Sequence, residues 1–185
     1  LTYLRSGRPQ QAVEAVDAAL RRVPDDPLLQ RLAGESKALT GNTAAAVKHF
    51  ERAASLEKTG VSARVRLAQV RLAQGDTARA ISDLEGLATA DPASVQADIA
   101  LYAAHMSRRQ YDKALAVLAN VEKKQPGAAG HELRGNVMLA KRDYKAARTS
   151  YAKALELEPA RLSAARRLAG LDLLDNKPAD AKARY

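Results

Sequence analysis

The sequence predicts an all-α fold, a right-handed α-solenoid of antiparallel helix pairs, and three observations support this prediction. An alanine recurs every 33 or 34 residues along the 185-residue chain, at positions 12, 46, 80, 114, 147 and 181. A large apolar residue follows this alanine by four positions, and a proline usually follows it by twelve, as in the stretch Tyr144 to Pro159. Each alanine lies at the same phase of an amphipathic helical pattern. A fixed period of this length is the sequence signature of a repeat protein.

The period divides the chain into a single array without internal domain boundaries. A partial repeat covers residues 1–26, full repeats cover 27–60, 61–94, 95–127 and 128–161, and a second partial repeat covers 162–185. Lys58 stands where the second proline of this pattern is expected. Because the chain starts inside one helix and stops inside another, we expect a fragment of a longer solenoid. Its ends should expose apolar faces around Leu1, Leu4 and Leu174 and self-associate weakly.

Within each repeat, the first helix is predicted to be covered on two sides and the second on one. In the stretch from Val61 to Gln74, a step of 100° per residue places apolar side chains on two nearly opposite faces. The following stretch from Thr77 to Pro92 has one apolar stripe, and its proline prevents the helix from continuing. Turn-forming residues separate the two helices, and Pro9 and Pro178 fall near a first helical turn, where proline is tolerated.

The recurrent alanine has a packing reason. A methyl group where the two helices of a pair cross lets their backbones approach closely. A larger side chain at Ala46, Ala80, Ala114 or Ala147 should therefore overpack the crossing.

These residues resemble the tetratricopeptide repeat family, and the resemblance covers the whole chain. Gly34 and Gly135 occupy the glycine position of the family pattern, with Ala68 and Ala169 as small substitutes. The chain departs from the pattern at Tyr102, where a small residue is usual, and it contains no tryptophan. The resemblance implies a tetratricopeptide superhelix.

The resemblance also implies a concave groove, lined by the first helices, that receives a peptide or a partner helix. The helical wheel places a set of mixed side chains on that sector: Leu28, Arg31, Glu35, Leu39, Ser62, Arg66, Gln69, Gln96, Ala103, Ser107, Glu132, Asn136, Ala140 and Arg166. Family members that grip a terminal carboxylate use lysines and asparagines there, and only Asn136 matches, which disfavours that mode. The alternative is that these residues form the less packed face of stacked helices.

The sequence predicts neither catalysis nor a cofactor or metal site. His49, His105 and His131 are too widely spaced for a pair of metal ligands on one helix face, and the chain has no cysteine. His105 lies in a column shared with Tyr3, Lys37, Arg71, Met138 and Asp172, which we interpret as variable packing. The sequence shows no apolar run long enough to cross a membrane. What remains is a non-catalytic scaffold that binds a protein or peptide partner.

The net charge of +9 supports an alternative function. Most of the excess lies after residue 94, and Lys141, Arg142, Lys145 and Arg148 cluster there. This basic half could bind an acidic polymer such as a polysaccharide or nucleic acid. The low aromatic content, 4%, disfavours nucleic acid because few rings are available for stacking on bases.

A more specific resemblance is carried by three stretches, Ala63 to Glu85, Tyr111 to Pro126 and Leu133 to Ala147. They are similar to the tetratricopeptide-repeat lipoproteins associated with the PEP-CTERM/exosortase system of Gram-negative bacteria. This resemblance implies a lipid-tethered protein on the periplasmic side of the bacterial cell envelope, serving protein sorting or exopolysaccharide assembly.

Overall fold

A computed structural model describes residues 2–57 and 60–184 of the chain. Its contacts divide the chain into two compact units, Leu1–Pro92 (unit 1) and Ala93–Tyr185 (unit 2). This division falls close to the predicted border between the repeats 61–94 and 95–127. The predicted apolar end around Leu1 and the substitution of proline by Lys58 lie outside the described residues.

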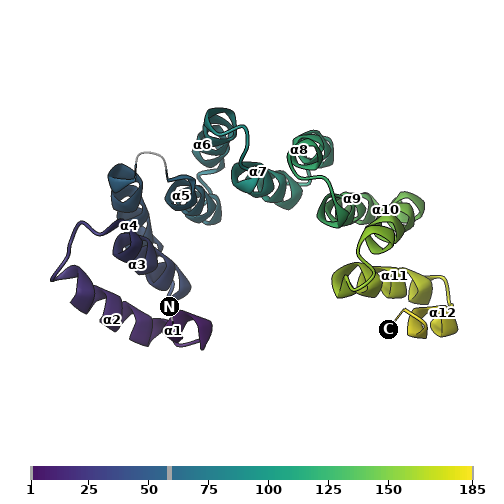
Figure 1. The fold of residues 1–185 in the computed structure, drawn as a ribbon, viewed down its shortest axis with the longest axis horizontal. Helices are drawn as coiled ribbons and strands as arrows, with labels where there is room; N and C mark the ends of the chain where they lie inside the picture. The colour runs from purple at the N-terminus through teal and green to yellow at the C-terminus, as the bar shows by residue number, and fades with distance from the viewer. Residues whose placement is uncertain (1, 58–59, 185) are drawn as a thin grey trace. The chain divides into compact units, whose positions relative to one another are not determined.

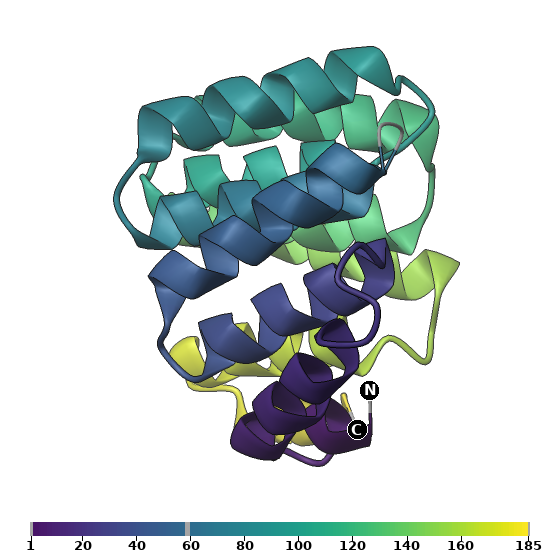
Figure 2. The same cartoon turned by 90° about the vertical axis from the view of Figure 1, so that its left-hand side faces the viewer.

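All regular secondary structure in the described residues is helical, as predicted (Figure 1). Unit 1 contains α1 (Thr2–Arg5), α2 (Pro9–Leu20), α3 (Pro27–Leu39), α4 (Thr43–Leu56), α5 (Val61–Ala73) and α6 (Thr77–Ala90). Unit 2 contains α7 (Gln96–Ser107), α8 (Tyr111–Lys124), α9 (Ala128–Ala140), α10 (Tyr144–Leu157), α11 (Leu162–Leu174) and α12 (Pro178–Lys182). Within each unit every helix packs against the next one in the chain. Figure 2 shows this for α3 and α4, which a short turn joins as antiparallel neighbours.

The helix starts follow from the local sequence. Proline occupies the first turn of α2, α3 and α12, which confirms the predicted positions of Pro9 and Pro178. The carboxylate of Asp26 accepts a hydrogen bond of 2.8 Å from the backbone N–H of Leu29 at the start of α3. Such a cap satisfies one of the N–H groups that the first turn of a helix leaves without a partner.

The turn inside each helix pair has one recurrent backbone geometry. After α3, the N–H of Gly41 donates to Ala38 O at 3.1 Å and the N–H of Asn42 donates to Lys37 O at 2.9 Å. This pattern is the Schellman motif, which requires a residue with positive φ after the helix. Gly41 has φ +81°. The same position, one repeat apart, is held by Gly7, Gly75, Arg109, Arg142 and Asn176, all with positive φ.

The alanine column is buried at the helix crossings. Ala46, Ala80, Ala114 and Ala147 are all fully buried, in agreement with the predicted close approach of the paired helices. The two-sided first helix is also confirmed, because α5 buries Ala63, Leu67 and Val70 on one side and Val65 and Ala68 on the other.

The glycine positions accommodate aromatic rings from the second helix of the pair. A Cβ at Gly34 would lie 2.7 Å from the ring of Phe50, and one at Gly135 would lie 2.5 Å from the ring of Tyr151. Tyr102, which departs from the family pattern, has a smaller neighbour in its cluster, Leu118. Its hydroxyl donates a hydrogen bond of 3.0 Å to the backbone carbonyl of Leu133 on α9.

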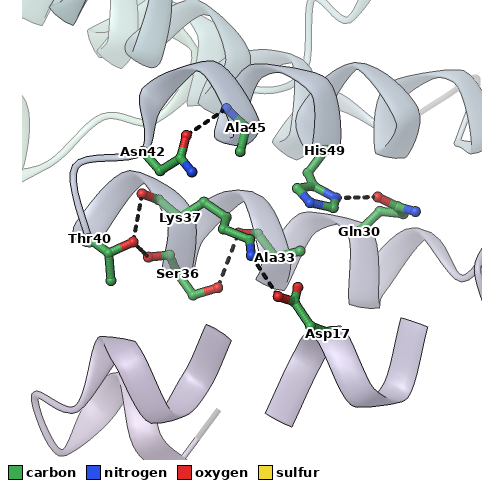
Figure 3. Close-up of polar contacts among 9 residues, drawn as sticks. All are labelled: Asp17, Gln30, Ala33, Ser36, Lys37, Thr40, Asn42, Ala45 and His49. Atoms are coloured by element: carbon green, nitrogen blue, oxygen red, sulfur yellow. Dashed lines mark hydrogen bonds and ion pairs between the residues drawn. The ribbon is translucent and has the colours of Figure 1, made fainter. Parts of the chain in front are cut away.

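The column of His105 also holds three charged side chains that form ion pairs: Lys37, Arg71 and Asp172. Lys37 on α3 pairs with Asp17 on α2 at 2.7 Å (Figure 3). Arg71 at the next position, on α5, bonds Glu51 on α4 and Asp83 on α6. These partners come from the second helices on either side, so the column links successive helix pairs.

In unit 2 one member of the same column, Asp172, carries the opposite charge. Asp172 on α11 is 4% exposed and accepts hydrogen bonds from Arg148 on α10 at 2.5 Å and from Arg184 at 3.0 Å. His105 is also buried, and its Nδ1 lies 2.9 Å from the side-chain oxygen of Gln110. Sequence spacing alone could not pair these groups, because the partners of the charged residues lie 12 to 24 residues away.

Candidate partner-binding groove

A hollow of about 370 Å³ lies between α3 and α5 in unit 1, on the face predicted to form the groove. We call it the α3/α5 hollow. Its lining comprises Leu4, Glu35, Ala38, Leu39, Thr43, Phe50, Arg66, Gln69, Val70 and Ala73. The structure therefore brings together four of the predicted groove residues, Glu35, Leu39, Arg66 and Gln69.

The apolar part of the hollow combines buried and exposed side chains. Phe50 is 1% exposed and Val70 is 9% exposed, so both belong to the packed core beneath the hollow. Leu39 is 65% exposed at the C-terminal end of α3, although leucine is among the residues most often buried. The hollow thus has an apolar floor and an apolar side chain that no described residue covers fully.

The polar part is a short chain of side chains along one wall. Arg66 Nε lies 3.6 Å from Glu35 Oε1, and Arg66 Nη1 donates a hydrogen bond of 3.1 Å to Gln69 Oε1. The Arg66 side chain is about half exposed, and the Glu35 carboxylate is too distant for a hydrogen bond. An exposed ion pair of this kind contributes little to stability. These groups can therefore exchange their present contacts for those of a ligand.

The other predicted groove residues of unit 1 do not line the hollow. Leu28 is exposed near the start of α3, while Arg31 and Ser62 are partly buried on α3 and α5. They lie toward the N-terminal ends of these helices, whereas the hollow extends toward the C-terminal ends.

Two predicted groove residues of unit 2 are engaged inside the fold. Asn136 Oδ1 accepts a hydrogen bond of 2.9 Å from the Tyr151 hydroxyl, and Glu132 pairs with Arg161 at the start of α11. Burial raises the pKa of Tyr102 and of Tyr151 to about 12, so both hydroxyls stay protonated and can donate at neutral pH. The other predicted residues of this unit are exposed or partly exposed: Gln96, Ala103, Ser107, Ala140 and Arg166.

The lining also contains six residues other than these four. Ala73 lies on the same predicted sector of α5, and the other five were not predicted: Leu4, Ala38, Thr43, Phe50 and Val70. Leu4 and Phe50 belong to apolar clusters, and Thr43 is the first residue of α4. A helical wheel of the first helices treats one helix at a time. It therefore carries no signal for residues that reach the groove from α1 or α4.

The described part of the chain contains no group of three or more His, Cys, Asp or Glu residues that could hold a metal ion. None of its helices is long and apolar enough to cross a membrane.

Comparison with solved structures shows that the fold is shared with several known proteins. The tetratricopeptide repeat protein TTC0263 of Thermus thermophilus superposes with a TM-score of 0.75 at 19% identity, over 93% of this chain and 94% of that one. Yeast Tom70 gives a TM-score of 0.81 at 16% identity, over 93% of this chain and 37% of that one. MamA from Desulfovibrio magneticus RS-1 gives a TM-score of 0.65 at 25% identity, over 86% and 91% of the two chains.

Sequence comparison gives the family. No curated protein matches the chain significantly. The family model described as a tetratricopeptide repeat-like domain matches residues 28–173. This match includes α4 to α10 completely and nearly all of α3. It therefore includes α3 and α5, the two helices on either side of the α3/α5 hollow. The chain therefore belongs to the tetratricopeptide repeat-like family.

Proposed function

We propose that the chain is a non-catalytic protein-interaction scaffold and that the α3/α5 hollow holds an apolar side chain of a partner segment. The observation that carries this proposal is the juxtaposition of exposed Leu39 with a polar wall of Glu35, Arg66 and Gln69. Ligand pockets commonly combine an apolar lining with a few orienting polar groups. YrrB, a tetratricopeptide repeat protein described as having an unusual peptide-binding site, shares the fold with a TM-score of 0.59.

The volume of the hollow suits a segment that inserts one or two side chains. A hollow of about 370 Å³ lies at the small end of the range of ligand pockets. An apolar residue of the partner would contact Leu39 and Phe50, and its backbone would bond Gln69 or Arg66. We expect the buried anchor to supply most of the binding energy, as in other interfaces.

Peptides selected from a displayed random library on the wild-type chain test this proposal. The groove variant carries Leu39→Lys and Ala73→Lys, at positions of the hollow that are both exposed. Such substitutions change stability by no more than about 0.5 kcal/mol. Selected peptides should bind the groove variant at least ~10-fold more weakly, because loss of an anchor contact costs about 2 kcal/mol or more.

A matched control carries Leu173→Lys and Ala152→Lys. Both positions are exposed in unit 2, and Leu173 is 60% exposed, close to the value for Leu39. The control changes the net charge by the same amount and should retain full binding. Equal binding by the groove variant and the wild type would refute the proposed site.

The rival function is electrostatic binding of an acidic polymer, a polysaccharide or nucleic acid, through the basic C-terminal half. Two of the four basic residues considered for it already form ion pairs. Arg148 bonds Asp172 and Asp175, and Lys141 lies 3.0 Å from Asp112. The salt dependence of binding distinguishes the two functions. Binding to a polyanion weakens steeply as the salt concentration rises, whereas binding of an apolar anchor changes little.

We further propose, on the resemblance of three sequence stretches alone, that the chain belongs to a lipoprotein of the PEP-CTERM/exosortase system. In that setting the hollow would hold a protein of the sorting or exopolysaccharide-assembly machinery on the periplasmic side of the envelope. Fractionation of the source cells, with an antibody against this chain, tests the assignment. Recovery of the protein in the cytosolic fraction would contradict it.

We also propose weak self-association through apolar side chains near the C-terminal end. Leu173 and Leu174 at the end of α11 are 60% and 69% exposed. Leu4, by contrast, packs against the cluster of Val16, Leu32 and Ala33. Light scattering over a range of concentrations should show a rising apparent mass, which Leu174→Lys should reduce. A constant monomer mass would contradict the proposal.

A further inference from the structure

Two neighbouring turns of unit 2 form a basic surface outside the groove. One joins α7 to α8 and the other joins α9 to α10, and Lys141 Nζ in the second lies 3.0 Å from Asp112 Oδ1 in the first. We call this surface the basic turn edge. It comprises six basic residues: Arg108, Arg109, Lys113, Lys141, Arg142 and Lys145. Only two acidic residues, Asp112 and Asp143, lie in the same turns.

Most of this positive charge is not neutralised. Of the six basic residues, only Lys141 forms an ion pair with another described residue, and all six are exposed. The carboxylate of Asp143 caps α10, because it accepts a hydrogen bond of 3.0 Å from the backbone N–H of Ala146. The guanidinium groups of this edge therefore keep their donors available for an external anion.

The backbone gives no reason for arginine in these turns. Arg109 and Arg142 occupy the left-handed position of the Schellman motif, with φ +58° and +64°. Glycine adopts this conformation without steric cost, and unit 1 has Gly7, Gly41 and Gly75 at the equivalent positions. Two arginines at the least favourable positions of adjacent turns therefore indicate a role for their side chains.

The two turns enclose a shallow hollow that suits an anionic group. Its volume is about 350 Å³, and its lining comprises Arg109, Gln110, Tyr111, Asp112, Lys113 and Lys141. Gln110 precedes α8 but makes no capping hydrogen bond, because its side chain bonds His105. The start of this 14-residue helix adds its positive dipole end to the charge of the three basic side chains.

We propose that the basic turn edge binds an acidic peptide segment of a partner protein, in which single carboxylates are separated by neutral residues. Asp112 and Asp143 alternate with the basic residues and would repel a polymer with closely spaced charges. Tyr144 is 46% exposed and is the one exposed large apolar or aromatic side chain described in these two turns. The edge therefore lacks both a stacking platform for nucleic acid and apolar side chains to insert into a membrane.

The test uses a fluorescein-labelled peptide of Glu-Gly-Gly repeats and measures anisotropy in about 50 mM salt, where surface charges are weakly screened. The variant carries Arg109→Gly and Arg142→Gly, which replace both arginines by the residue that their backbone conformation favours. Its Tm should equal or exceed that of the wild type, so a loss of binding cannot be attributed to unfolding. The peptide should bind this variant at least ~10-fold more weakly, because each guanidinium supplies charge-assisted hydrogen bonds.

The control variant carries Lys48→Gln and Arg79→Gln, which remove the same charge from exposed positions of unit 1. It should bind the peptide like the wild type. Equal peptide binding by the glycine variant and the wild type, or no binding by the wild type, would overturn the proposal. Tighter binding of heparin, an oligothymidylate or anionic vesicles than of the peptide would overturn the choice of partner. The site lies in unit 2, so these outcomes are independent of the α3/α5 hollow.

Discussion

Phe50 on α4 packs so closely over Gly34 on α3 that a Cβ at position 34 would lie 2.7 Å from the ring. No side chain fits there unless the ring moves, and Phe50 is 1% exposed within a packed cluster. The glycine of the family pattern is therefore a packing requirement of this helix pair.

We predict that Gly34→Ala destabilises unit 1 by about 1–2 kcal/mol, since overpacking outweighs the helix propensity that alanine gains. Urea denaturation followed by circular dichroism measures the change. Adding Phe50→Leu should restore part of the loss, because Ala68 and Leu84 hold the equivalent positions one repeat later. Gly86→Ala is the control, because a Cβ there meets nothing within 4 Å, and it should stabilise by about 0.5–1 kcal/mol. Equal stability of Gly34→Ala and the wild type would contradict the packing argument.

The second prediction concerns Asn136, whose amide oxygen accepts from the Tyr151 hydroxyl at 2.9 Å. Asn136→Ala removes the acceptor of a largely buried hydroxyl and should destabilise unit 2 by about 1–2 kcal/mol. Gln69→Ala, at the equivalent position in unit 1, is exposed and should change stability by less than about 0.5 kcal/mol. The same denaturation experiment compares them. If both substitutions lower the free energy of unfolding equally, the hydrogen bond of Asn136 to Tyr151 does not contribute to stability.

The third prediction is acid sensitivity through Asp172. Burial alone would raise the pKa of this carboxyl, but the hydrogen bonds and charges of Arg148 and Arg184 outweigh it and lower the pKa. The unfolded chain then binds the proton more readily than the folded chain. The stabilisation is complete above the unfolded pKa, about 3.9, and is lost as the pH falls through the folded value.

Asp172→Asn should therefore lower Tm at pH 7, by an amount equivalent to about 2 kcal/mol, and should show a smaller further loss below pH ~4 than the wild type. Thermal melts across this range, with exposed Asp180→Asn as control, provide the comparison. Parallel pH profiles for wild type and Asp172→Asn would show that the ion pairs do not couple to folding.

The fourth prediction concerns His49, which bonds Gln30 at 2.7 Å and lies near the Lys37–Asp17 ion pair (Figure 3). Burial first and the charge of Lys37 second lower its pKa, against the opposing effect of Asp17. Protonation therefore favours the unfolded chain. Stability should be complete above pH ~6.5 and should fall as the pH decreases toward the folded pKa. A Tm series from pH 7.5 to 5 should show this loss, and His49→Gln should reduce it. An unchanged slope in the variant would exclude His49 as its origin.

The last prediction concerns the left-handed position of the turns. Gly75→Ala should destabilise unit 1 by about 1 kcal/mol, because an L-residue pays a steric cost at φ +88°. Thermal denaturation measures it. Ala73→Ser, on the last residue of α5, changes an exposed side chain without a positive φ and should be nearly neutral. If Gly75→Ala were also neutral, the arginines of the basic turn edge would carry no conformational cost.

The sequence by itself determined the helix pairs, their turns and the buried alanine column. These features repeat every 33 or 34 residues and depend on local properties, namely apolar periodicity, proline placement and the need for small side chains at crossings. Gly34 and Gly135 were assigned from the resemblance to the family pattern, and an aromatic ring packs closely over each of them. The structure also brings together four side chains that the helical wheel placed on one sector, since Glu35, Leu39, Arg66 and Gln69 line one hollow.

Only the tertiary structure decided which polar side chains are bonded inside the fold and which remain available to contact a ligand. Asn136 and Gln69 share one position in the repeat, yet Asn136 bonds Tyr151 whereas Gln69 lines the hollow. A second position of the repeat is held by Lys37, Arg71 and Asp172. Their ion-pair partners come from neighbouring second helices. A helical wheel gives the direction of a side chain, but its environment depends on the size and charge of residues that the fold brings from adjacent helices. For this reason the period predicts the architecture of the chain, and the contacts between repeats decide which polar side chains lie open at its surface.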